Sequence, residues 1–192
     1  MIQVSKNTIV IYGAKRSGNH LLQGYFKSKG EECEFRHEAK WAKRLYKEKG
    51  KQLIILVRNP RDQLISNMYS MHNAHKGGYD VGHIDRPLEE HEPQILVPEV
   101  VGAACKYLKE FTDGVVKLAG TYPYQFILYD TIAKKDLNTN YTQRGPEYYK
   151  KAIVNYDYIN EILDNSDIEE YCLKIWRAFN LQQTVFYPEL AN

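Results

Sequence analysis

The chain contains 192 residues, 43% hydrophobic and 26% charged, which predicts one globular domain over residues 1–192 and excludes a disordered chain. Its formal net charge of +2 gives no indication of binding to nucleic acid or to a membrane surface. No apolar run approaches the roughly 20 residues of a membrane span, and no secretory signal pattern opens the sequence. The three cysteines, Cys33, Cys105 and Cys172, are too scattered for a disulfide framework or a metal site. We therefore expect a cytoplasmic protein.

In the first part of the chain, short apolar runs alternate with amphipathic segments. We predict strands at residues 8–12, 34–36 and 52–57. The run at 52–57 is continuously apolar, which is typical of a central parallel strand buried on both faces. Helices are predicted from Asn19 to the residues before Gly30, at 39–49 and at 61–71.

The second part of the chain is less regular. Residues 72–98 are rich in glycine, proline and histidine, and we predict a long loop or lid there. Beyond it we predict helices at 99–119, 147–163 and 168–179, a strand at 124–129 and an irregular segment at 134–145. Strands that alternate with helices indicate an α/β fold, here a three-layer sandwich with a central, mostly parallel sheet. Ligands of such folds bind where strand ends meet helix starts.

The first strand–loop–helix junction, residues 13–20, is predicted to bind a phosphate or sulfate group. Its two glycines let the backbone turn tightly, and the helix start presents N–H groups to an anion. The residues expected to hold the anion are Lys15, Arg16, Ser17, Gly18, Asn19 and His20. The loop resembles a P-loop, but Asn19 and His20 replace the Lys and Ser/Thr of that pattern. The alternative is a glycine turn that only joins a strand to a helix.

The second junction follows the predicted strand at 52–57. It reads Arg58-Asn59-Pro60-Arg61-Asp62, with Ser66 one or two helical turns further on. An arginine offers a planar, permanently charged fork for phosphate oxygens, and a serine hydroxyl on the same side can donate another hydrogen bond. The alternative for Arg58 is an ion pair with Asp62, one helical turn away.

These two junctions resemble the cofactor-binding motifs of the sulfotransferases that use 3′-phosphoadenosine 5′-phosphosulfate (PAPS). The family's 3′-phosphate motif, Arg-Asn-Pro-[Lys/Arg]-Asp with a serine eight positions after the first arginine, is matched by Arg58 and Ser66. Its 5′-phosphosulfate loop, Pro-Lys-Ser-Gly-Thr-Thr, resembles residues 15–20, with Arg16 at the position of the lysine. Residues 126–130 resemble the family's later strand, which ends in Tyr-Glu-Asp.

The resemblance implies an enzyme that takes PAPS as its donor and needs no metal. Lys15 and Arg16 are then expected to stabilise the departing 3′,5′-bisphosphate. Residues 143–145, Gln-Arg-Gly, weakly resemble the family's Arg-Lys-Gly loop, and Arg144 is therefore expected to contact the 3′-phosphate as well. His37 has the position of the family's general base, and Glu38 is the alternative base.

The sequence leaves the acceptor and two other functions open. The acceptor is expected to be a hydroxyl or amine of a small molecule or glycan, and sugar, lipid, peptide tyrosine, phenol and amine all remain candidates. One alternative function is a P-loop-like nucleotide or metabolite kinase, and another is a non-catalytic nucleotide-binding module. The source of adenine stacking is open too, because Leu21 replaces the family's aromatic residue. Nothing in the sequence indicates the oligomeric state.

Overall fold

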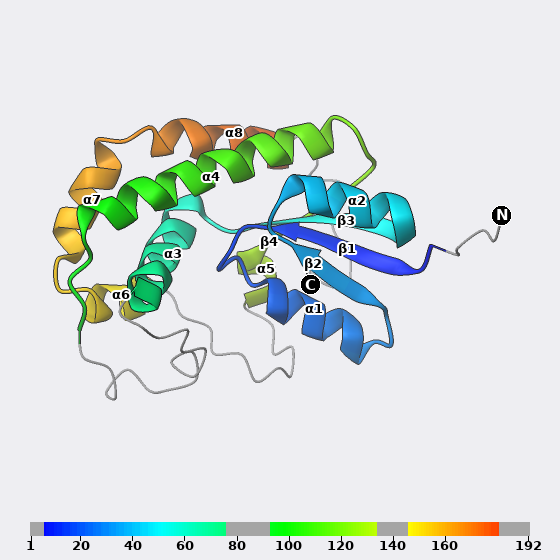
Figure 1. Cartoon of the computed structure of the whole chain (residues 1–192), viewed down its shortest axis with the longest axis horizontal. Coiled ribbons are helices and arrows are strands. Elements are labelled where there is room, and N and C mark those ends of the chain that lie inside the picture. The colour runs from blue at the N-terminus through cyan, green and yellow to red at the C-terminus, as the bar shows by residue number, and fades with distance from the viewer. Residues whose placement is uncertain (1–5, 76–92, 134–145, 181–192) are drawn as a thin grey trace.

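The computed structural model describes residues 6–75, 93–133 and 146–180, which form a sheet covered by helices (Figure 1). The strands are β1 (Thr8–Gly13), β2 (Cys33–Arg36), β3 (Gly50–Val57) and β4 (Gln125–Leu128). The helices are α1 (Asn19–Ser28), α2 (Ala39–Lys49), α3 (Pro60–His75), α4 (Pro98–Ala119), α5 (Tyr129–Ala133), α6 (Pro146–Ala152), α7 (Tyr156–Asp164) and α8 (Ile168–Asn180). Within these described ranges, no helix has the length and apolar character needed to cross a membrane.

The four described strands form one parallel sheet in the order β2-β1-β3-β4, which confirms the predicted α/β fold. β1 lies inside the sheet, with Ile9 beside Cys33 of β2 and Ile11 beside Ile54 of β3. The chain leaves β1 toward one edge of the sheet and leaves β3 toward the other edge. The carboxyl ends of β1 and β3 therefore form the switch point at which parallel sheets bind their ligands.

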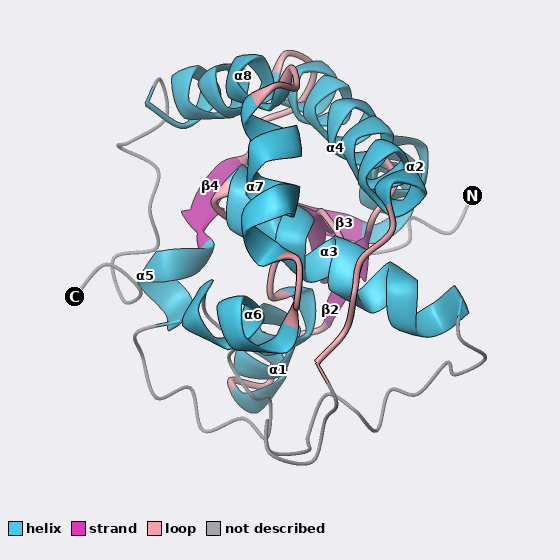
Figure 2. Ribbon diagram, turned by 90° about the vertical axis from the view of Figure 1, so that its left-hand side faces the viewer, coloured by secondary structure: helices cyan, strands magenta, loops and turns pink. Residues whose placement is uncertain are grey.

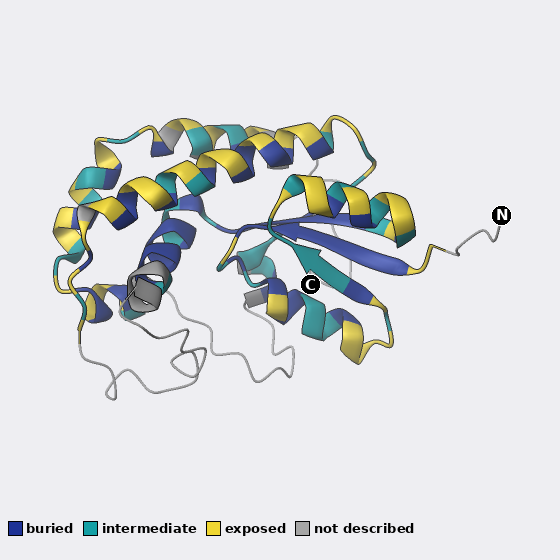
Figure 3. Cartoon of the chain, viewed as in Figure 1, coloured by how far each residue is buried: buried dark blue, intermediate teal, exposed yellow. Residues whose placement is uncertain are grey.

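Different helices cover the two faces of the sheet, as a three-layer sandwich requires (Figure 2). Successive side chains of a strand point to opposite faces, and the packing of β1 follows this alternation. Ile9 and Ile11 pack in a cluster with Phe26 of α1, whereas Val10 and Tyr12 belong to a larger core beneath α2, α3 and α4. Every residue of β1 is buried as a result (Figure 3).

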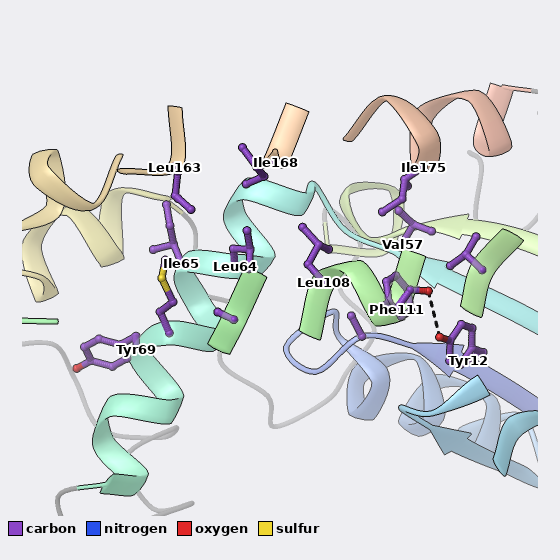
Figure 4. Packing of buried hydrophobic residues seen from close by; sticks show 14 of the residues in the cluster. Tyr12, Val57, Leu64, Ile65, Tyr69, Leu108, Phe111, Leu163, Ile168 and Ile175 are labelled. Atoms are coloured by element: carbon purple, nitrogen blue, oxygen red, sulfur yellow. Dashed lines mark hydrogen bonds between the residues drawn. The ribbon is translucent and has the colours of Figure 1, made fainter. Parts of the chain in front are cut away.

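The larger core extends beyond the sheet into a layer of helices (Figure 4). Leu64 of α3 and Ile168 of α8 share this core with residues of the sheet. α4 approaches β1 so closely at Gly114 that an added Cβ would overlap the Tyr12 hydroxyl. That hydroxyl donates to the Phe111 carbonyl at 3.1 Å, which fixes α4 over the end of β1.

The helix predicted over 147–163 is divided into α6 and α7. Gln94 forms an isolated parallel bridge with Ile153 at the division. The side chain of Asn155 forms hydrogen bonds with both the N–H and the carbonyl of Leu96. Its Nδ2 donates to the Leu96 carbonyl at 2.8 Å, and its Oδ1 accepts from the Leu96 N–H at 2.9 Å. The prediction was wrong because the Ala152 carbonyl and the Val154 N–H, which would continue a helix, bond to the backbone of Gln94 instead.

Two predicted boundaries are also wrong. α3 continues to His75, so residues 72–75 of the predicted loop are helical, because residues 61–75 contain no glycine or proline that would break the helix. β4 ends at Leu128, and Tyr129 opens α5 instead of closing the strand. Residues 76–92 of the predicted loop and the predicted irregular segment at 134–145 lie outside the described residues.

Candidate functional site

The two predicted junctions meet at the carboxyl ends of β1 and β3. The loop between β1 and α1 contains two residues in the left-handed region, Arg16 with φ 66° and Gly18 with φ 83°. Glycine adopts this region freely, whereas a residue such as arginine is strained there by about 1–3 kcal/mol. Strain of this kind persists only where the surrounding contacts hold the backbone in place.

Side chains from two other helices hold this loop. Gln63 Nε2 of α3 donates to the Lys15 carbonyl at 2.6 Å, and the Tyr107 hydroxyl of α4 accepts from the Lys15 N–H at 2.8 Å. Within the loop, Asn19 Nδ2 donates to the Ala14 carbonyl at 2.7 Å. The Asn19 side chain therefore shapes the loop itself. Its backbone N–H, in the first turn of α1, is the group it can offer to an anion.

Arg58, just after β3, contacts the loop between β1 and α1. The residue is only 7% exposed, and its Nη1 donates to the Arg16 carbonyl at 2.9 Å. Its guanidinium carbon also lies 4.8 Å from the centre of the Tyr129 ring, within cation–π distance. The same ring fills the space in front of Gly18, where an added Cβ would lie 2.6 Å from it. Tyr129 thus contacts both junctions at once.

The Arg16 side chain reaches from the first junction to the second. Its Nε donates to Ser66 Oγ at 3.3 Å, and Ser66 Oγ lies 2.6 Å from the Tyr149 hydroxyl. Ser66 is 1% exposed and Tyr149 is 2% exposed, so this end of the hydrogen-bonded chain is enclosed by protein, whereas Arg16 is half-buried. Arg16 and Arg58 bring two guanidinium groups to one edge of the sheet, an arrangement that attracts phosphate or sulfate.

The start of α1 contains polar atoms that lack a partner. Ser17 Oγ and Asn19 Oδ1 are buried, with no hydrogen-bond partner among the described residues. A buried polar group left in this state costs about 1–3 kcal/mol. Ser17 precedes the first N–H groups of α1, which have no acceptor within their own helix. A bound anion would satisfy the hydroxyl of Ser17 together with these N–H groups.

His37 follows β2 and lies beside the loop. Its Nδ1 is 2.8 Å from the Gly13 carbonyl oxygen, which only accepts, so Nδ1 carries the proton and Nε2 has the lone pair. Burial, with a smaller effect of the Lys15 charge, lowers the pKa of His37 below its ordinary 6.5, although the bond to Gly13 opposes the shift. His20 is exposed on one side but packs its ring 4.6 Å from that of Phe35, and this partial burial lowers its pKa too. Both imidazoles are therefore mainly neutral at neutral pH.

Other predicted site residues lie at the surface or outside the described chain. Lys15 is exposed, and its Nζ lies 5.6 Å from the centre of the Tyr107 ring. Glu38 is also exposed and forms an ion pair with Lys40 at 3.0 Å. Arg144 lies outside the described residues, so its predicted contact with the 3′-phosphate stays a prediction.

The second arginine of the matched motif has a different place from the first. Arg61 turns toward α7, where its Nε donates to Asn160 Oδ1 at 3.1 Å and its Nη1 to Asp164 Oδ1 at 2.6 Å. These bonds fasten α7 to α3. The two arginines of the motif therefore have different roles: Arg58 contacts the loop, and Arg61 joins α3 to α7.

The sequence did not single out three residues that now belong to the site: Gln63, Tyr107 and Tyr149. Gln63 lies between the Arg-Asn-Pro-Arg-Asp motif and Ser66, and its place in this matched segment was the one signal that could have identified it. Tyr107 and Tyr149 are two of 16 tyrosines, and no pattern distinguishes them from the others.

Comparisons of the chain with protein-family models, with curated proteins and with solved structures return no match. Folds of this class host many unrelated activities, so the fold alone does not assign one. In the part of the chain that the structure describes, no three His, Cys, Asp or Glu side chains gather as a metal site. The function therefore has to be inferred from the side chains at the two junctions.

Proposed function

We propose that this protein is a sulfotransferase that moves a sulfuryl group from PAPS to a hydroxyl or amine. The observation that carries the proposal is the meeting of the two junctions, where Arg16 contacts Ser66 through its side chain and Arg58 through its carbonyl. PAPS has a phosphosulfate and a 3′-phosphate on one ribose. The start of α1 would hold the phosphosulfate, and Arg58 with Ser66 would hold the 3′-phosphate.

The proposed reaction is an in-line displacement at sulfur. The acceptor oxygen or nitrogen forms a bond to sulfur, and the bond between sulfur and the bridging oxygen of PAPS breaks. The electron pair of that bond remains on the 5′-phosphate of the departing 3′,5′-bisphosphate. Lys15 and Arg16 would stabilise the charge that grows on this oxygen, because they are the cations of the loop that holds it.

The proton of the acceptor has to reach a base. We favour His37 over Glu38, because the Nδ1 bond to Gly13 leaves Nε2 as the proton acceptor and the lowered pKa keeps the ring neutral. Glu38 is instead exposed and paired with Lys40. His37 would accept the proton from the acceptor as the bond to sulfur forms.

A kinase is less well supported at this site. Magnesium-dependent phosphoryl transfer uses a hydroxyl after the loop and an acidic ligand at the end of a second strand. Asn19 stands at the loop with its amide turned inward, and Arg58 stands at the end of β3. A non-catalytic nucleotide-binding module is the second candidate. Asn19 and His20 favour it, because they replace the residues that follow the loop in the family's pattern.

PAPS as the donor, a reaction without a metal and a cytoplasmic location all belong to this proposal. A small-molecule or glycan acceptor belongs to it as well. Neither nucleic acid nor a membrane is part of the proposed reaction.

Calorimetric titration with 3′-phosphoadenosine 5′-phosphate tests the proposal, with ATP plus Mg²⁺ titrated in parallel. We expect the protein to prefer the bisphosphate. Arg58→Ala should weaken that binding by roughly a hundredfold, because a buried cation is removed from a charged ligand. Arg44→Ala is the matched control, since Arg44 is an exposed arginine of α2 that pairs with Glu48. Preference for ATP–Mg²⁺, or equal binding of ligands with and without a 3′-phosphate, would contradict the proposal.

A further inference from the structure

A cavity of about 210 Å³ lies beside the loop, where α2 and α4 pack over the end of β1. It is lined by Tyr12, His37, Glu38, Ala39, Lys40, Tyr107, Glu110 and Phe111. Two of these residues also touch the loop: His37 bonds the Gly13 carbonyl, and the Tyr107 hydroxyl accepts from the Lys15 N–H. The cavity therefore adjoins the site proposed for the phosphosulfate, on the side of the proposed base.

The cavity wall offers one proton acceptor and one proton donor. His37 Nε2 has a lone pair, because Nδ1 is committed to Gly13. The Tyr107 oxygen accepts from the loop, so its own proton remains to be donated. Burial raises the pKa of Tyr107 to about 12, which keeps this proton in place at neutral pH. A hydroxyl group that enters the cavity can therefore donate to His37 and accept from Tyr107.

The size and walls of the cavity favour a flat, apolar body. Tyr12 of β1 and Phe111 of α4 are buried, and their rings lie 5.0 Å apart between the strand and the helix (Figure 4). The Tyr12 hydroxyl is already bonded to the Phe111 carbonyl, and the two side chains are only 1% and 3% exposed, so they close the cavity with an apolar wall. A volume of about 210 Å³ is below the usual range for drug-sized ligands. One aromatic ring with a short side chain suits it better than a glycan or a lipid tail.

The charges at the cavity favour a cation. Glu38 and Lys40 form an ion pair with each other at 3.0 Å and largely offset one another. Glu110 is exposed and has no ion pair among the described residues, whereas the nearby cation Lys15 lies 5.6 Å from the centre of the Tyr107 ring. The negative charge is therefore local to the part of the cavity around Glu110. Glu110 lies one helical turn beyond Tyr107 on α4, and its charge contributes to the raised pKa of the Tyr107 hydroxyl. An ammonium group would be attracted to Glu110, and a carboxylate would be repelled.

We propose that this cavity is the acceptor site, and that the acceptor is a small phenol with a cationic amine side chain. The inference rests on the proposed function, because the acceptor hydroxyl is the group that attacks the sulfur of PAPS. That hydroxyl lies against His37 Nε2, which takes its proton, and the aryl ring lies on Tyr12 and Phe111. The ammonium group lies against Glu110, away from the reacting atoms.

Three phenols that differ only in the substituent opposite the hydroxyl test the charge preference: tyramine, 4-methylphenol and 4-hydroxyphenylacetate. Each is titrated calorimetrically into the full chain saturated with 3′-phosphoadenosine 5′-phosphate. We expect tyramine to bind about tenfold more tightly than 4-methylphenol, and 4-hydroxyphenylacetate to bind most weakly. Glu110→Gln should bring tyramine to the affinity of 4-methylphenol. Glu99→Gln is the matched control, since Glu99 is another exposed glutamate of α4, remote from the lining residues.

The outcomes separate this inference from the proposed function. Equal binding of the three probes, or an unchanged tyramine affinity in Glu110→Gln, overturns the inference, while Arg58-dependent bisphosphate binding leaves the sulfotransferase proposal standing. Loss of bisphosphate binding overturns both, even where tyramine still binds. Transfer of sulfate from PAPS to tyramine, abolished in His37→Asn but with tyramine binding retained, supports both.

Discussion

The Arg16 side chain donates to Ser66 Oγ at 3.3 Å, although 50 positions of sequence separate the two residues. This bond joins the loop after β1 to the helix after β3. A ligand that reaches Ser66 has to share its hydroxyl with Arg16 or displace the arginine. The geometry of the first junction and the affinity of the second are therefore coupled through one hydroxyl.

Ser66→Ala should reduce affinity for a ligand with a 3′-phosphate and leave affinity for 5′-AMP unchanged. A hydrogen bond to a charged group contributes about 1.5–3 kcal/mol, so we expect a loss of about ten- to a hundredfold for the bisphosphate. Calorimetry with both nucleotides measures the difference. An equal loss for the two would mean that Ser66 only supports the loop.

Tyr149→Phe tests how the Ser66 hydroxyl is oriented. Ser66 Oγ accepts from Arg16, and if the Tyr149 hydroxyl also donates to it, the serine proton is left for a ligand oxygen. Removing the Tyr149 hydroxyl should lower the free energy of unfolding by about 1 kcal/mol and weaken bisphosphate binding several-fold. Urea denaturation and calorimetry measure the two effects. Tyr148→Phe is the control, because it changes the neighbouring position on α6 without touching Ser66. The same loss of affinity in both variants would refute this role.

Gly18→Ala should destabilise the protein more than Gly30→Ala does. Both glycines have positive φ, 83° and 78°, so alanine is strained by about 1 kcal/mol at either position. At Gly18 the new Cβ would also lie 2.6 Å from the Tyr129 ring, whereas at Gly30 nothing lies within 4 Å. The free energy of unfolding of each variant gives the comparison. Equal losses would mean that Tyr129 moves aside without cost.

The stability of the protein should fall as the pH drops below about 6.5. The pKa values of His20 and His37 are both lowered in the folded state, chiefly by burial. Below 6.5 the unfolded chain binds protons that the folded chain does not, and protonation then favours unfolding. Urea denaturation on both sides of this value measures the slope, which His37→Asn should reduce. A slope of the opposite sign would contradict the assignment.

The pH dependence of the transfer rate should reflect the ionisation of His37 as well. Neutral His37 is the proposed base, so kcat/KM should be constant above pH 6.5 and fall on the acid side, with an inflection below 6.5. His37→Asn should lower kcat by a hundredfold or more, since general base catalysis contributes about 10²–10⁴-fold. Glu38→Gln is the control. An acid limb that persists in His37→Asn and disappears in Glu38→Gln would transfer the role to the carboxylate.

Local pattern in the sequence was enough to predict the sheet. β1 and β3 contain short runs of apolar and β-branched residues, and such runs favour strands when turn residues flank them. The two junctions were predictable as well, because a glycine turn at Gly18 and an arginine at the end of a buried strand are features of adjacent residues. Parallel strands place their carboxyl ends at one edge, so the proximity of Arg16 and Arg58 followed from the fold class.

The tertiary structure alone decided which distant side chains complete the site. Tyr107 bonds the Lys15 N–H across 92 positions, and Tyr149 bonds Ser66 across 83. The division of α6 from α7 depends in the same way on Asn155 and Leu96, 59 positions apart. The sequence by itself determines strands, turns and helix faces, because these depend on neighbouring residues. Contacts between helices depend on how the whole chain packs, and no local pattern encodes them.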